Sequence, residues 1–177
     1  MSEEVQSILP SIAILGSLAA VALYLTLARG GVAGSGAQLR AAVHVAIVAV
    51  LLQGAHFAEE LATGFHVRFP EIFALPPMPA GFFVSFNIVW LVIWGLGIWG
   101  LAARRWLALF PPWFLGLASA VNALAHPLLS LGTGGYFPGL VSSPFVGIAG
   151  AILLRQLLRL TGHPRPQLSV EAEGPPG

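Results

Sequence analysis

The chain alternates between long uncharged apolar runs and short segments rich in arginine, glutamate, glycine or proline. Five runs are long enough for a helix of about 20 residues, which crosses about 30 Å of hydrocarbon. They predict membrane spans at residues 8–28, 41–63, 81–103, 107–130 and 138–158. The last two are separated by the glycine-rich segment 132–139, a cluster of turn-forming residues. We therefore expect an all-α, five-helix transmembrane bundle that forms a single membrane domain over residues 1–160, followed by a disordered tail over residues 161–177.

The composition excludes an ordinary soluble domain. Of the 177 residues, 56% are hydrophobic and 8% are charged, whereas soluble domains average about 25% charged residues. The net charge of +1 gives no basic surface for nucleic acid, and the lack of cysteine excludes disulfides and thiolate metal ligands. The first run follows Glu3 and Glu4 rather than basic residues, and it is too long for a signal peptide, so we expect it to be retained. The expected partners are membrane lipids.

Arginine is concentrated in alternate loops. Arg68, beside Glu71, lies between the second and third spans, and the loop between the fourth and fifth spans has no arginine. The other seven arginines flank the first and third loops or follow the fifth span: Arg29, Arg40, Arg104, Arg105, Arg155, Arg159 and Arg165. Because arginine-rich loops stay in the cytoplasm, we expect an outside N-terminus and a cytoplasmic C-terminus. The expected location is a bacterial inner membrane, crossed several times.

Polar residues occur at one depth in three of the spans. His56, Glu59 and Glu60 lie near the end of the second span, Asn87 near the start of the third and His126 near the end of the fourth. At 1.5 Å per residue, all three groups are about 24–30 Å from the arginine-bearing side. Ionisable residues within a span usually face the bundle interior. The sequence therefore predicts a shared polar layer near the outer leaflet.

Helical spacing refines this layer. Gln53, His56 and Glu60 fall on one stripe of a helix, and Asn122 precedes His126 by one turn. Pro127 follows His126 directly, which biases His126 away from the helical conformation, and a kink there would expose polar backbone beside the histidine. His44, near the inner end of the second span, is expected to have a structural role instead.

Three sequence elements resemble a known family. Residues 56–60 form an H-x-x-E-E sequence, His126 supplies a further histidine, and residues 136–139 form a Y-x-P-G sequence. In this order they resemble the HXXEE family of integral membrane proteins, from the second helix to the start of the fifth. The resemblance implies membership of that family and opens an enzymatic role, but it brings no established substrate or reaction.

The chemistry of His56, Glu59, Glu60 and His126 leaves three interpretations open. The carboxylates at the helix end could simply reach water among the lipid headgroups. The four residues could instead bind one divalent metal ion, since histidine and glutamate are ordinary ligands of zinc and iron; a di-iron site needs about four carboxylates. They could also transfer protons without a metal.

The remaining candidates are expected to bind substrate. Asn87 and Asn122 lie in or near the polar layer, and Tyr136, Pro138 and Gly139 form a turn that would close the site from outside. Residues 65–73, with phenylalanine at every fourth position, predict an amphipathic segment on the outer surface.

The preferred hypothesis is a small membrane enzyme, either of isomerase or hydrolase type or a metal-dependent lipid enzyme. Its expected substrate is a lipid or an isoprenoid-like molecule, because a polar site at the hydrocarbon edge can receive molecules from the bilayer. The alternative is a non-catalytic protein, either a proton- or metal-coupled carrier or a membrane assembly subunit.

Overall fold

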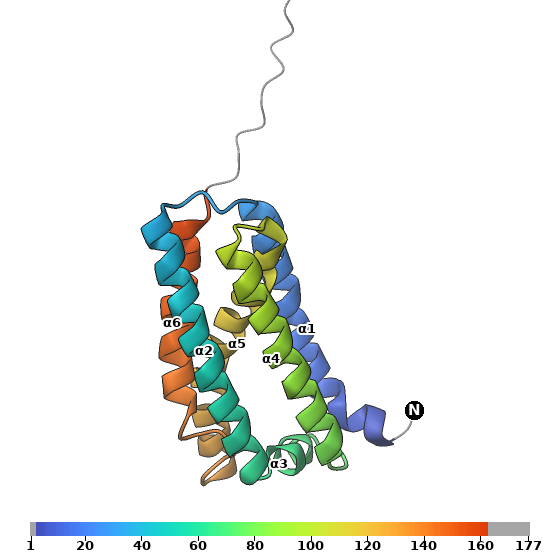
Figure 1. Cartoon of the computed structure of the whole chain (residues 1–177). Coiled ribbons are helices and arrows are strands. Elements are labelled where there is room, and N and C mark those ends of the chain that lie inside the picture. Colours follow the sequence, from blue (N-terminus) through green and yellow to red (C-terminus); the bar gives the residue numbers. More distant parts are fainter. Residues whose placement is uncertain (1–2, 163–177) are drawn as a thin grey trace, which may run out of the picture.

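The computed structural model describes residues 3–162, and their side chains from Val5 onward. Five long helices are α1 (Glu3–Arg29), α2 (Gly36–Ala62), α4 (Ala80–Ala102), α5 (Phe110–Thr133) and α6 (Ser143–Leu160). A short helix α3 (Phe65–Glu71) follows α2, and a 3₁₀ turn η1 (Trp106–Leu109) precedes α5. Within the described residues the only β structure is an isolated bridge between Val32 and Thr161. The prediction of an all-α bundle with five helices long and apolar enough to cross a membrane is confirmed (Figure 1).

Two details of the predicted spans are wrong. Helix α6 begins at Ser143 rather than at 138, because Pro138 and Gly139 form a turn in which Gly139 has a φ of 88°. Helix α5 continues through Pro127, and His126 stays helical. The loss of one backbone donor is tolerated there, as it often is in membrane helices.

The predicted tail begins inside the ordered fold. Thr161 is buried, and its side chain accepts a hydrogen bond of 2.8 Å from Arg29 Nε. From residue 163 onward the predicted tail lies outside the described residues.

One end of the bundle is tied together by arginine. Besides Thr161, Arg29 donates to the carbonyl of Leu158, and Arg104 donates to the carbonyls of Val32 and Gly34, each at 3.0 Å. Helix α3 lies at the opposite end (Figure 1). The loops that are rich in arginine thus lie at one end of the bundle, and the loops with little or no arginine lie at the other.

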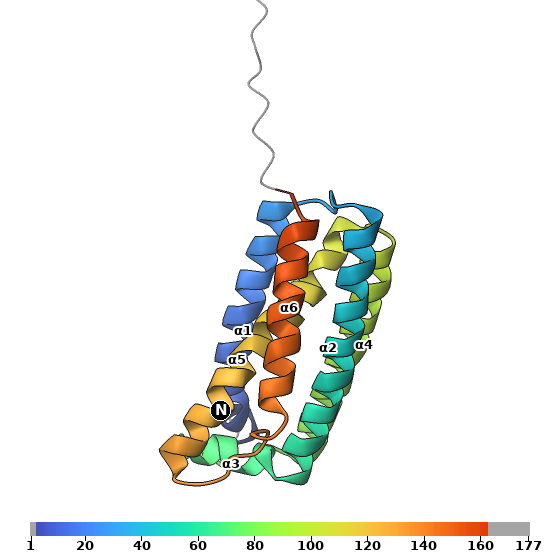
Figure 2. The same ribbon diagram turned by 90° about the vertical axis from the view of Figure 1, so that its left-hand side faces the viewer.

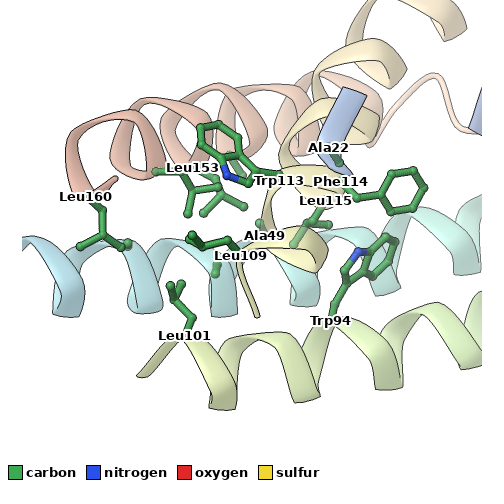
Figure 3. Close-up of a cluster of buried hydrophobic side chains, with 14 residues drawn as sticks. Ala22, Ala49, Trp94, Leu101, Leu109, Trp113, Phe114, Leu115, Leu153 and Leu160 are labelled. Carbon is green, nitrogen blue, oxygen red and sulfur yellow. The ribbon is translucent and has the colours of Figure 1, made fainter. Parts of the chain in front are cut away.

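The apolar core lies mainly among α2, α4, α5 and α6. Figure 3 shows its large side chains, with Trp94 of α4 near Phe114 of α5 and Trp113 of α5 beside Leu153 of α6. Helices α5 and α6 approach closely at glycine: a Cβ on Gly150 would lie 2.6 Å from the Cβ of Ser119. Small residues allow such close packing in membranes, where apolar burial alone does not drive helices together. The α5–α6 pair therefore supplies a firm support for the loop between them.

Helix α1 is peripheral. It packs mainly against α5, and few of its side chains are buried. In Figure 2, α1 lies at the left of the bundle and α4 at the right. Side chains of α1 and α4 line a common cavity.

The predicted amphipathic segment is present as helix α3. Phe65 and Phe69 stack with their ring centroids 4.9 Å apart, and Phe69 is buried whereas Phe73 is exposed. Helix α3 therefore covers the end of the bundle that holds the polar residues.

Candidate functional site

Three of the predicted site residues converge. His56 and Glu60 come from one face of α2, and His126 comes from α5. The Nε2 atoms of both histidines lie 3.5 Å from the same oxygen, Oε1 of Glu60. All three side chains are buried, and their potential ligand atoms lie within 4.8 Å of one another. The predicted pairing of His56 with Glu60 and their shared layer with His126 are thus confirmed.

A hydrogen bond to a carbonyl orients His126. Its Nδ1 lies 2.6 Å from the backbone oxygen of Pro138. Because a carbonyl can only accept, Nδ1 carries the hydrogen and donates it. In neutral His126 the lone pair is then on Nε2, facing Glu60.

A hydrogen bond to the loop orients His56. Its Nδ1 lies 2.7 Å from Oγ of Ser142, whose backbone N–H donates to Oε2 of Glu59 at 2.8 Å. A serine hydroxyl can accept as well as donate, so His56 can donate from Nδ1 and carry its lone pair on Nε2. No hydrogen-bond partner of this Nε2 is found among the described residues.

When both Nδ1 atoms donate, the cluster brings three acceptor atoms together: two histidine Nε2 atoms and one carboxylate oxygen. A proton on Glu60 could be donated to only one of the histidines, whereas a divalent cation would satisfy all three atoms. Zinc bonds of about 2.0–2.1 Å in a tetrahedral arrangement place neighbouring ligand atoms about 3.4 Å apart. The two Nε2–Oε1 separations of 3.5 Å fit this value, and the set of three ligand atoms, within 4.8 Å of one another, is slightly wider. Hydrogen bonds from the outer ring nitrogen are also typical of metal-binding histidines. His56, Glu60 and His126 could therefore hold one divalent ion.

Glu59 does not belong to this cluster. Its Oε1 accepts hydrogen bonds from the Tyr136 hydroxyl at 2.6 Å and from the Val141 backbone N–H at 3.0 Å. Its Oε2 accepts from the Ser142 backbone N–H at 2.8 Å. Glu59 therefore holds the loop between α5 and α6 against the end of α2. It was predicted as a metal ligand or catalytic residue, but in the structure it positions this loop.

The Y-x-P-G segment packs against both histidines. Tyr136 is the predicted hydroxyl donor, but it donates to Glu59; burial, followed by that hydrogen bond, raises the pKa of Tyr136. The Pro138 carbonyl orients His126. A Cβ on Gly139 would lie 2.5 Å from His126 Cε1 and 2.9 Å from His56 Cε1, so only glycine allows the backbone to approach both rings. Tyr136, Pro138 and Gly139 thus shape the site rather than line the cavity described next.

An apolar cavity of about 360 Å³ adjoins the cluster. Glu60 and His126 line it, whereas His56 lies outside its lining. The predicted binding residues Asn87 and Asn122 also line it, together with Gln53. Aromatic and aliphatic side chains from α1, α3, α4 and α5 form the rest of its wall. His44 is distant from this cavity and lines a separate shallow groove with residues of α6.

The sequence interpretation missed the partners supplied by the loop and by α5. Ser142, which bonds His56, stands in an apolar-rich segment with no motif that marks it. Ser119 donates to Gln53 Oε1 at 3.2 Å in the buried part of the bundle. Both contacts join residues far apart in the chain, so local spacing could not reveal them.

Comparisons with known proteins give no information about this site, so it is interpreted from its own chemistry. Searches against protein-family models, curated proteins and solved structures found no match to this chain.

Proposed function

We propose that the chain is a small membrane enzyme that uses one divalent metal ion, held by His56, Glu60 and His126, on a lipid or isoprenoid-like substrate. The observation that carries this proposal is the convergence of two buried histidine nitrogens on one buried carboxylate oxygen. A set of two histidines and one glutamate is a common ligand set of catalytic zinc.

An open position beside the ligands would give such an ion its chemistry. Three protein ligands leave room for water or a substrate oxygen, and a bound zinc ion polarises that oxygen or lowers the pKa of its water to about 7. Glu60 and His126 face the cavity while His56 lies behind them, so the open position would face the cavity. The surrounding apolar wall would keep bulk water away from the reaction.

The position of the cluster in the membrane favours a lipid or isoprenoid-like substrate. The cluster lies near the end of α2 that is opposite the arginine-bearing end, and we propose that this is the outer leaflet of a bacterial inner membrane. Resemblance of the H-x-x-E-E, histidine and Y-x-P-G elements to the HXXEE family supports an enzymatic role. The mutual contacts of these elements explain why they occur together, since the loop orients both histidines.

The proposal is tested by incubating membranes that contain the chain with a total lipid extract in D₂O, followed by chromatography and mass spectrometry. Isomerisation by proton transfer places deuterium on a carbon of the product, where it is retained and raises the product's mass. Hydrolysis places deuterium only on hydroxyl groups, which exchange it before detection, so hydrolysis is recognised by the masses of the new fragments. We expect products with the parent chain that are lost in Glu60→Gln and His126→Ala. His44→Ala is the matched control and should keep them.

Two results would overturn the proposal. One is a lipid profile that does not depend on the parent chain, which would favour the carrier or assembly alternatives. The other is undiminished product formation by Glu60→Gln, which would remove the cluster from the chemistry.

A further inference from the structure

The cavity is the right size for one apolar chain. An engineered cavity of about 150 Å³ holds benzene, which corresponds to about 25 Å³ for each non-hydrogen atom. By this measure the 360 Å³ cavity holds roughly 14 non-hydrogen atoms. That is a single aliphatic or isoprenoid chain, and it is too small for the two chains of a phospholipid.

The cavity opens toward the bilayer between α1 and α4. Both helices line it, yet α1 packs mainly on α5 and makes few contacts with α4. Ile12 of α1 and Phe82 of α4 line the cavity and are also 52% and 41% exposed, so they stand at its mouth. Gly16 of α1 also lines it, and a Cβ there would meet nothing within 4 Å.

The wall of the cavity contains an unused hydrogen-bond donor. Asn87 lines the cavity and is 7% exposed, and its Nδ2 finds no partner in the part of the chain that the structure describes. Trp94, two turns farther along α4, lines the cavity with an Nε1 that is likewise buried and unpaired there. A buried donor without a partner is costly, so native proteins seldom keep one unless water or a ligand satisfies it.

We infer that this cavity binds one single-chain amphiphile, which enters sideways from the bilayer between α1 and α4, and that Asn87 donates a hydrogen bond to an oxygen of that molecule. The inference deepens the proposed function by naming the substrate class, a single apolar chain with an acceptor oxygen near its polar end. Asn87 is then a specificity-determining residue, because it distinguishes an oxygen-bearing chain from a plain hydrocarbon. The aromatic side chains of Trp90, Trp94 and Phe114 would contact the apolar chain.

Asn87→Leu separates binding from stability. Leucine has nearly the same size but no donor, so the unpaired Nδ2 is removed from an apolar wall. The variant should therefore unfold at the same or a higher temperature than the parent. Its affinity for an oxygen-bearing chain should fall about tenfold, the usual effect of losing one buried hydrogen bond.

The test uses a photoreactive diazirine analogue of a C11 primary alcohol, with the matching C11 hydrocarbon as comparison, added to the chelator-treated chain in lipid nanodiscs. After illumination, labelled peptides are identified by mass spectrometry. We expect the alcohol to label cavity residues of α1, α4 and α5 in the parent. Gly16→Phe, which fills the cavity, should lose at least nine tenths of this labelling. Gly95→Phe should keep it, since Gly95 also has open space around it but does not line the cavity.

The Asn87→Leu variant completes the experiment. Half-maximal labelling by the alcohol should need about tenfold more probe, while labelling by the hydrocarbon should stay unchanged. Equal labelling in Gly16→Phe and the parent would overturn the lateral cavity, and an unchanged alcohol titration in Asn87→Leu would overturn the role of Asn87. Because the chain is kept free of metal, either failure is distinguishable from a failure of the metal-dependent activity.

Discussion

Gly139→Ala should displace the histidine rings of the cluster, although it replaces none of the residues His56, Glu60 and His126. The new Cβ would lie 2.5 Å from Cε1 and 2.7 Å from Nδ1 of His126, and 2.9 Å from Cε1 of His56. Ordinary contact begins near 3.4 Å, so the His126 ring must move by about 0.9 Å. Metal–ligand distances tolerate about 0.2 Å, so the variant should lose metal as well as stability.

The magnitude can be worked out against a matched control. Gly139 has a φ of 88° and Gly134 a φ of 73°, so alanine at either position costs about 1–2 kcal/mol of backbone strain. A Cβ on Gly134 meets nothing within 4 Å, whereas one on Gly139 adds overpacking of about 1–3 kcal/mol. At about 2–4 °C for each kcal/mol, Gly139→Ala should unfold roughly 2–12 °C below Gly134→Ala.

The assay is thermal unfolding in detergent, followed by tryptophan fluorescence, with metal content measured on the same samples. Gly134→Ala should keep the parent's metal content, and Gly139→Ala should lose most of it. Equal unfolding temperatures and equal metal contents in the two variants would refute the close approach of the loop to both histidine rings.

Three further predictions follow from the loop and from the two ends of the bundle. Glu59→Ala removes the acceptor of three hydrogen bonds, so hydrogen exchange at residues 136–142 should rise at least tenfold, and unchanged exchange would argue against this anchor. Tyr136→Phe removes one of these bonds in a half-exposed position, so it should cost about 1 kcal/mol in thermal unfolding and leave metal content unchanged. A reporter fused after residue 160 should be cytoplasmic and one inserted between residues 74 and 79 external; the reverse result in both would contradict the arginine-based orientation.

Much of the fold could be predicted from the sequence because membrane spans depend on local properties. Length and hydropathy located five helices, and the helical period placed Gln53, His56 and Glu60 on one buried face. His126 joined them because distance from the arginine-bearing end converts directly into depth. These relations need no knowledge of how the loops fold.

The direction of Glu59 could not be predicted in the same way. Neighbouring residues on a helix point about 100° apart, so Glu59 and Glu60 cannot both face His56 and His126. Which one turns inward depends on the loop after α5, whose N–H groups at Val141 and Ser142 bind Glu59. The start of α6 was missed for the same reason, because the positive φ of Gly139 is stabilised by packing against the histidines.

The cavity could not be predicted from the sequence either. Its volume depends on side chains of five helices, α1 to α5, which lie far apart in the chain. Asn87 and Asn122 were expected near the site from their depth, but the missing partner of Asn87 becomes visible only in the folded arrangement.

The metal content of the purified chain tests the central claim most directly. The chain should be purified without a histidine tag, dialysed against metal-free buffer and measured by inductively coupled plasma mass spectrometry, alongside His56→Ala, Glu60→Gln, His126→Ala and the control His44→Ala. The account predicts close to one equivalent of zinc, iron or manganese in the parent and in His44→Ala, and less than a tenth of an equivalent in each of the other three. A parent chain that holds no metal even after incubation with these ions, or three cluster variants that bind as much as the parent, would contradict it.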